Sequence, residues 1–224
     1  MERIGAYILT GGQSSRMGTP KARLKIGGYS FVEIAARALG AVSEDIKIVG
    51  GVIRESDEWA TIPDVVTCGA RGPLVGIYSA LSDCSSAWAF VLACDMPFVS
   101  ADLIAYLASV DRVGFDAVVP MQANGRAQPI CALYRRATCL AAADELIRGE
   151  DQSLHALLER IRVRPVPFSS FELIANSKDP FMNVNTPEDL RIAEARYLNS
   201  KPLRDQIGLT SLPVHPPPIF GKAE

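Results

Sequence analysis

Residues 4–21 of the chain read IGAYILTGGQSSRMGTPK, an apolar run that ends in paired glycines and is followed by two cations. We expect a buried strand over Ile4–Thr10, stopped by Gly11-Gly12. Glycines at such a point let successive backbone N–H groups face one concavity, where they bind phosphate without obstruction from side chains. Arg16 would add positive charge for a polyphosphate as a planar fork, and Lys21 as a point charge. The stretch therefore predicts a phosphate-binding loop after the first strand.

This loop differs from two common phosphate-binding motifs. The dinucleotide fingerprint G-x-G-x-x-G is absent, and no G-K-[ST] follows as it would in a Walker loop. The alternative interpretation is a plain glycine turn with two solvated cations. The combined order of strand, Gly-Gly, Ser, Arg-Met-Gly and Lys favours phosphate binding over that alternative.

Apolar runs alternate with helical patterns along most of the remaining chain, which is typical of a layered α/β domain. We expect a single-domain, Rossmann-like three-layer sandwich over residues 1–198, with a mostly parallel mixed sheet. A proline-rich tail over residues 199–224 is expected to be extended or disordered. Further strands are predicted over Ile46–Val49, Trp88–Cys94, Ala117–Pro120, Pro129–Tyr134 and Val163–Phe168. Helices are predicted over Phe31–Val42, Leu74–Leu81, Ala137–Ile147 and Ser153–Ile161, after a cap at Ser100, and from Pro187 after a cap at Thr186.

The amino-acid composition disfavours several classes of function. The 224 residues carry a net charge of −2 and only two histidines, which disfavours electrostatic nucleic-acid binding and chemistry that needs several imidazoles. The five cysteines form no C-x-x-C pair and are expected to be small buried residues in a reducing compartment. No signal peptide or membrane span is recognisable. We therefore expect a cytoplasmic protein that binds neither nucleic acid nor membrane.

Four further blocks extend the pattern of the first loop in a fixed order. They are Gly72–Ile77, Cys94–Phe98, Gln128-Pro129 and Asn183–Leu190. With Leu9–Lys21, which is close to L-A-G-G-x-S-x-R-M-G-x-D-K, these blocks make the chain resemble the nucleotidyltransferase superfamily over about residues 4 to 198. The resemblance is greatest to the molybdenum cofactor guanylyltransferases, the MobA-like proteins.

The resemblance implies a reaction and its substrates. The donor would be GTP, and the acceptor would be molybdenum-loaded molybdopterin, whose phosphate attacks the α-phosphate in line while pyrophosphate leaves. Catalysis would consist of positioning and charge neutralisation, with Mg²⁺ at Asp95 and with Lys21 and Arg16 beside the phosphates. A monomer is expected, and a molybdopterin-transferring or acceptor protein could be its partner.

Several residues match positions that contact nucleotide or metal in that family. Asp95 directly follows an apolar strand, where a carboxylate can hold Mg²⁺ together with phosphate oxygens and water, or can cap a turn before Pro97. Asn185 would be a second metal ligand, or would form an Asx turn before the next helix. Asp64 could accept hydrogen bonds from guanine N1–H and the exocyclic amine, or lie on an exposed loop. The implied nucleotide contacts are Leu9, Thr10, Gly11, Gly12, Lys21, Gly50, Asp64, Gly72 and Asp95.

Two positions depart from the family pattern. Thr10 stands where Ala is usual, a small change that should preserve the loop geometry. Pro20 replaces the Asp that commonly precedes the loop lysine, and Pro-Lys is familiar in sugar-nucleotide and isoprenoid cytidylyltransferases. The alternatives are therefore a cytidylyltransferase or sugar-nucleotide pyrophosphorylase, or a nucleotide-binding regulatory protein without turnover.

Overall fold

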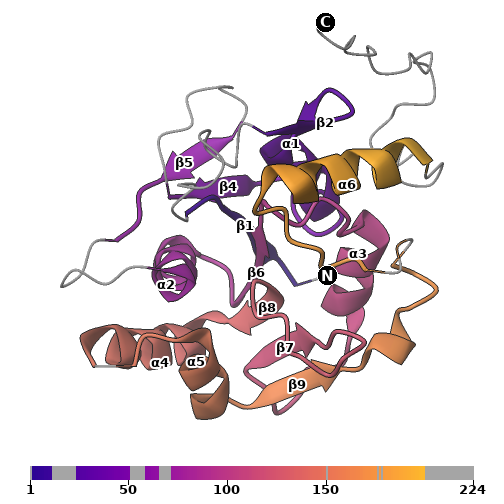
Figure 1. The fold of residues 1–224 in the computed structure, drawn as a ribbon. Helices are drawn as coiled ribbons and strands as arrows, with labels where there is room; N and C mark the ends of the chain where they lie inside the picture. The colour runs from indigo at the N-terminus through magenta and orange to yellow at the C-terminus, as the bar shows by residue number, and fades with distance from the viewer. Residues whose placement is uncertain are drawn as a thin grey trace, which may run out of the picture.

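The computed structural model describes residues 2–11, 24–50, 59–65, 72–149, 151–175, 177 and 179–199 (Figure 1). Within these ranges one mixed sheet forms the centre of the molecule. Its strands are β1 (Ile4–Leu9), β4 (Ile46–Val49), β5 (Ala60–Ile62), β6 (Trp88–Ala93), β7 (Ala117–Pro120), β8 (Cys131–Arg135) and β9 (Val163–Val166). They lie in the order β5-β4-β1-β6-β8-β7-β9, and only β8 runs antiparallel to its neighbours. The expected mostly parallel mixed sheet is confirmed.

Helices cover both faces of this sheet, which confirms the expected three layers. One face carries α1 (Phe31–Leu39), α3 (Ala101–Ser109) and α6 (Pro187–Asn199), and the other carries α2 (Pro73–Asp83), α4 (Arg136–Arg148) and α5 (Leu154–Arg160) (Figure 1). Successive residues of β1 alternate between the layers: Ala6 and Ile8 pack with α1, whereas Tyr7 and Leu9 pack with α2. This alternation is the period of two that a strand imposes on its side chains.

The predicted elements appear with small shifts at their ends. The Ser100 cap is confirmed because its hydroxyl accepts from the Leu103 N–H at 3.1 Å. The Thr186 cap is confirmed as well, since Thr186 Oγ1 accepts from the Asp189 N–H and Asp189 Oδ2 accepts from the Thr186 N–H. The first predicted helix ends at Leu39 rather than Val42, and the last predicted strand ends at Val166. Asn199, expected in the tail, is the last residue of α6, and residues 200–224 lie outside the described ranges.

A short hairpin and one edge strand were not predicted. The hairpin pairs β2 (Lys25–Ile26) with β3 (Tyr29–Ser30) through Gly27 and Gly28, whose φ angles are 59° and 91°. Two positive φ values at the turn favour glycine, and strands of two residues are too short to show a hydrophobic period. The edge strand β5 is only three residues long.

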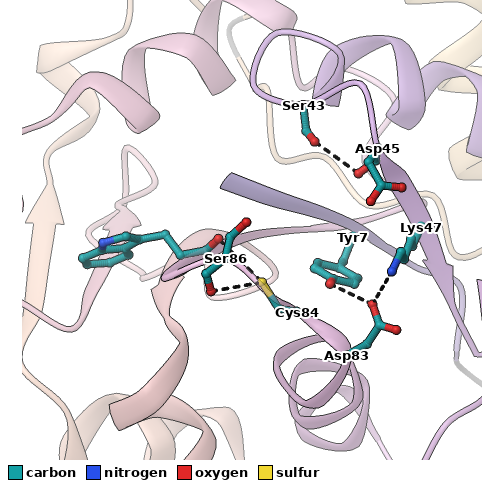
Figure 2. A network of polar contacts seen from close by, with 8 residues as sticks. Tyr7, Ser43, Asp45, Lys47, Asp83, Cys84 and Ser86 are labelled. Carbon is teal, nitrogen blue, oxygen red and sulfur yellow. Dashed lines mark hydrogen bonds and ion pairs between the residues drawn. The ribbon is translucent and has the colours of Figure 1, made fainter. Parts of the chain in front are cut away.

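Figure 2 shows a network of polar contacts in which hydrogen bonds connect the end of α2 to the sheet. Asp83 Oδ2 accepts a hydrogen bond from the Tyr7 hydroxyl at 2.9 Å and one from Lys47 Nζ at 2.8 Å. Burial raises the pKa of Tyr7, so the phenol stays protonated and donates. Because Tyr7 lies in β1 and Lys47 in β4, one carboxylate joins two strands and a helix.

The expected burial of the cysteines is confirmed for the residues that the structure describes. Cys84, Cys94, Cys131 and Cys139 are buried, while Cys68 lies outside the described ranges. Trp88 is buried in the core, and Trp59 packs partly buried against it. In the described part of the chain, no helix has the length and apolar character needed to cross a lipid bilayer.

Asp116 should stabilise the fold above about pH 4 and lose that effect in acid. Its buried carboxylate accepts from Arg162 Nε at 2.9 Å, from Nη2 and from the Arg162 backbone N–H, and these bonds lower the pKa of Asp116 to about 2. A depressed carboxyl pKa adds stability above the unfolded pKa that disappears as pH falls through the folded value. Asp116→Asn should therefore lower the free energy of unfolding at pH 7 by about 1 kcal/mol, a modest loss because Arg162 is exposed to water.

Urea unfolding of wild type and Asp116→Asn at pH 7 and pH 2.5 measures this contribution. The difference between the two proteins should be about 1 kcal/mol at pH 7. It should be clearly smaller at pH 2.5, which lies just above the folded Asp116 pKa of about 2. A difference that stayed constant across this range would contradict the assigned role of the Asp116 carboxylate.

Candidate functional site

The candidate site lies along one edge of the sheet. Strands β1, β4, β5, β6, β7 and β9 are mutually parallel through the pairings given above, so their carboxyl ends share this edge. The chain leaves β1 through α1 toward β4 on one side, and it later leaves β5 through α2 toward β6 on the other. Such a reversal of direction opens a crevice at the carboxyl end of the central strand, where α/β proteins bind ligands.

Thr10 and Gly11 follow β1 and lie at the centre of this edge. The Thr10 backbone N–H donates to the Val49 carbonyl at 3.0 Å, and the Thr10 hydroxyl lies within hydrogen-bond distance of the Val49 and Gly50 carbonyls. Thr10 therefore ties the start of the first loop to the end of β4, which an alanine at this position could do only through its backbone. Gly50 has a φ of 78° and donates its N–H to the Ile62 carbonyl.

Asp64 brings a carboxylate to the same place from the end of β5. A Cβ built on Gly50 would lie 3.0 Å from Asp64 Oδ2, and one built on Gly11 would lie 3.7 Å from the same oxygen. Burial raises the pKa of Asp64, because a desolvated carboxylate is harder to ionise. Hydrogen-bond donors brought by a ligand would offset that cost. Of the two interpretations made from the sequence, the geometry favours a binding residue over an exposed loop aspartate.

Leu9 and Gly72 contribute through packing and backbone. The Leu9 side chain is buried against α2, where a Cβ on Gly76 would come within 3.2 Å of it, and the Leu9 carbonyl accepts from the Cys94 N–H at 3.0 Å. Gly72 is the N-cap of α2 and has a φ of 107°. Because α2 follows β5 in the chain, this helix starts at the same edge of the sheet. Because the helix begins in a left-handed residue, a side chain at Gly72 would strain the backbone.

Asp95 and Asn185 come together although they are 90 positions apart in the chain. Asp95 follows β6, and its carbonyl accepts a hydrogen bond from the Val184 N–H at 2.9 Å. Asn185 comes next in the chain, and its backbone N–H donates to Asp189 Oδ2, so the turn before α6 fixes its position. The hydrogen bond between Cys94 and Leu9 keeps Asp95 beside the end of β1.

The chemistry of these two side chains fits a divalent cation. A carboxylate and an amide oxygen are hard donors, and Mg²⁺ commonly takes only one or two protein ligands because it retains water and binds substrate phosphates. Among the side chains that the structure describes, no group of three or more His, Cys, Asp or Glu residues gathers at one point. Asp95 and Asn185 would supply one carboxylate and one amide oxygen to such a cation.

Three residues expected in the site, Gly12, Arg16 and Lys21, lie outside the described ranges. Their neighbours in sequence are described: Gly11 lies at the edge of the sheet, and Leu24 accepts at its carbonyl from the Phe31 N–H at the start of α1. The roles of the three residues remain predictions from the sequence.

Gln128 is a residue to which the sequence motifs assigned no role. It is only 5% exposed, and its Nε2 is buried without a hydrogen-bond partner. The Gln128-Pro129 pair was visible in the sequence, but residue type alone does not reveal an unsatisfied amide. Arg126, two positions earlier, is exposed at the same edge.

Comparisons with known proteins show the family of this chain. The family model of the MobA-like NTP transferase domain matches residues 6–166. A probable molybdenum cofactor guanylyltransferase of Geobacillus sp. (strain WCH70) is 35% identical over 197 residues, which cover 84% of this chain and 97% of that protein. Another from Pelotomaculum thermopropionicum is 34% identical over 203 residues, covering 90% and 97%.

Solved structures show the same fold at lower identity. Molybdopterin-guanine dinucleotide biosynthesis protein A from Archaeoglobus fulgidus superposes with a TM-score of 0.73 at 24% identity, over 86% of this chain and 98% of that one. A 2-C-methyl-D-erythritol 4-phosphate cytidylyltransferase from Thermus thermophilus superposes with a TM-score of 0.61 at 18% identity, over 88% and 98%. Enzymes named for different nucleotides therefore share this fold, so the fold does not determine which nucleotide base is bound.

Proposed function

Because this chain belongs to the MobA-like NTP transferase family, we propose that it transfers GMP from GTP to the phosphate of molybdenum-loaded molybdopterin and releases pyrophosphate. The product would be the guanine dinucleotide form of the molybdenum cofactor. Relatives named as molybdenum cofactor guanylyltransferases match most of the chain and nearly all of their own length, which supports this assignment.

The position of Asp64 is the observation that favours guanine as the bound base. Its desolvated carboxylate lies against Gly11 and Gly50, where neither residue has a side chain to obstruct a base. Guanine presents two adjacent donors, N1–H and the 2-amino group, to the two oxygens of a carboxylate. Cytosine offers only its exocyclic amine as a donor, so it would leave one oxygen of Asp64 unsatisfied.

The remaining site residues would bind the phosphates and the metal ion. The backbone amides after β1, with Arg16 and Lys21, would bind the phosphates and stabilise the negative charge that develops as pyrophosphate departs. Asp95 and Asn185 would hold Mg²⁺. When bound, Mg²⁺ would neutralise phosphate charge and orient the donor. No nucleophilic side chain is required, because the acceptor phosphate is already ionised.

Pyrophosphate release tests the proposal directly. The full chain is mixed with Mg²⁺, molybdenum-loaded molybdopterin and each nucleoside triphosphate in turn. Release with GTP and not with CTP supports the proposal. Release only with CTP, or only with a sugar phosphate as acceptor, would instead establish the cytidylyltransferase or pyrophosphorylase alternative, and GTP binding without release would indicate a regulatory protein.

Asp64→Asn should shift base selectivity from guanine toward xanthine. The asparagine amide N–H would face the guanine 2-amino group, whereas it could donate to the 2-oxo group of xanthine. We expect the preference for GTP over XTP to fall by about a hundredfold, the value of one bidentate base contact. Competition binding with GTP and XTP measures the change, and unchanged selectivity would remove Asp64 from the base site.

Wild-type GTP binding should also weaken as the pH falls toward the raised pKa of Asp64, since the protonated carboxyl accepts fewer hydrogen bonds. Asp64→Asn is the matched control and should lose this dependence.

We also propose that the protein acts as a monomer in the cytoplasm and exchanges molybdopterin or its product with a second protein. Free, buried thiols in the described ranges suit a reducing compartment. The large apolar side chains exposed in those ranges, Val65, Val113, Leu173 and Ile192, are scattered in sequence rather than grouped in one segment. The molar mass of the purified protein, measured by light scattering, tests whether it is a monomer.

A further inference from the structure

The segment between β7 and β8 folds into a closed turn over Gln122–Gln128. The Gln122 N–H donates to the Arg126 carbonyl at 2.8 Å, and the Gln128 N–H donates to the Pro120 carbonyl at 2.9 Å. Gly125 has a φ of 80°, and its N–H donates to the Gln122 carbonyl at 2.9 Å. These bonds give the turn a defined shape, and nothing in the nucleotide site described above uses it.

The antiparallel pairing of β6 and β8 places this turn at the same edge as Asp95. Leu92 pairs with Cys131, and the Ala93 N–H donates to the Ile130 carbonyl at 2.8 Å, beyond the last paired position. Asp95 lies three residues after Leu92, and Gln128 lies three residues before Cys131. Both residues therefore extend past the same end of the sheet.

Gln128 is the strongest indication of a ligand here. The residue is 5% exposed, and its Nε2 is buried without a hydrogen-bond partner. A buried amide N–H₂ without an acceptor costs stability, so native proteins normally satisfy it. A bound molecule with an oxygen or ring-nitrogen acceptor would supply the missing partner.

Arg126 adds a cation to the same turn. It is exposed, and among the residues that the structure describes no carboxylate forms an ion pair with it. A guanidinium without a carboxylate partner is suited to a phosphate, which it can bind through two parallel hydrogen bonds. One turn thus combines a phosphate-binding cation with an unsatisfied hydrogen-bond donor.

We propose that Gln122–Gln128 forms the acceptor subsite of this enzyme, where Arg126 binds an anionic group of the acceptor and Gln128 Nε2 donates to it. This inference rests on the proposed transfer to a phosphate-bearing acceptor. In-line displacement requires the acceptor to approach the α-phosphate opposite the leaving pyrophosphate. Asp64 and Gly50 place the nucleotide over β5, β4 and β1, and the turn lies on the other side of Asp95, over β8 and β7.

Binding of molybdopterin to the full chain without nucleotide tests the subsite, with Gln128→Leu, Arg126→Gln and the control Arg3→Gln. Arg3 is an exposed arginine before β1, at the opposite edge of the sheet. Each subsite variant should raise the Kd for molybdopterin about tenfold, the value of one hydrogen bond to a charged group, and leave the Kd for GTP unchanged. Arg3→Gln should change neither Kd, and Arg126→Lys should recover part of the lost affinity.

Thermal unfolding separates binding from structure. Because Gln128 Nε2 makes no bond within the protein, Gln128→Leu should not lower the unfolding temperature. A lower unfolding temperature together with unchanged molybdopterin binding would make Gln128 a structural residue and overturn the proposal. Arg126→Gln lies on an exposed turn, so it provides the test even if Gln128→Leu does not fold.

Failure of the subsite and failure of the proposed function give different results. If wild type releases pyrophosphate from GTP and the two subsite variants bind molybdopterin as wild type does, the subsite is wrong and the function stands. If wild type binds molybdopterin through these residues and never releases pyrophosphate, the subsite stands and the function is wrong.

Discussion

Asp95→Asn should reduce turnover with GTP by about a thousandfold, the upper range for losing one group that stabilises transition-state charge. The substitution keeps the size of the side chain and removes its charge. The hydrogen bond from the Val184 N–H goes to the Asp95 carbonyl and is unaffected, so the local fold should survive. Steady-state pyrophosphate release over a range of Mg²⁺ concentrations measures the effect.

Two controls isolate the charge at Asp95. Asp111→Asn neutralises an exposed carboxylate after α3 and should leave turnover unchanged. The double variant Asp95→Asn with Asn185→Asp returns a carboxylate to the neighbouring position and should recover part of the metal dependence. If Asp95→Asn alone kept the wild-type rate, Asp95 would not hold the metal, and the proposed metal site would be wrong.

Lys21→Gln should lower kcat by about a hundredfold, since a lysine beside the departing pyrophosphate acts mainly in the transition state. The KM for the acceptor should change little, because the acceptor approaches from the opposite side of the α-phosphate. Lys25→Gln is a matched control four positions away: Lys25 is exposed in β2 and should be dispensable. A Lys21→Gln enzyme within about threefold of wild type would exclude Lys21 from catalysis, since a group that stabilises transition-state charge contributes far more than that.

The fold was largely predictable because its elements carry strong local patterns. Trp88–Ala93 is buried at every position, and Phe31–Leu39 presents an apolar face that ends at Gly40. Such patterns reflect burial by a sheet between two helical layers. The hairpin of β2 and β3 was not predicted because strands of two residues show no hydrophobic period. Its turn contacts α6, where Gly27 packs against the buried Tyr197 ring.

The site was predictable only in part. Asp95 and Asn185 were recognisable by the strand end and the helix cap beside them, whereas their proximity follows from one hydrogen bond between distant segments. Asp64 had two open interpretations in the sequence, and burial against Gly11 and Gly50 favours one of them. Gln128 belongs to one of the motif blocks, but no local pattern showed that its amide is unsatisfied, since that property is defined by the surrounding residues.

The sequence alone determines the strands, the helices and the glycine-rich loop, because hydrophobic period and turn chemistry act over a few neighbouring residues. It also determines the class of reaction, through motifs in which residue type and spacing carry the chemistry. Only the tertiary structure decides that the Asp64 carboxylate lies against Gly11 and Gly50, that the segment before α6 meets Asp95, and that the Gln128 amide is buried without a partner. Those properties depend on desolvation and on contacts between residues far apart in the chain, which no local pattern encodes.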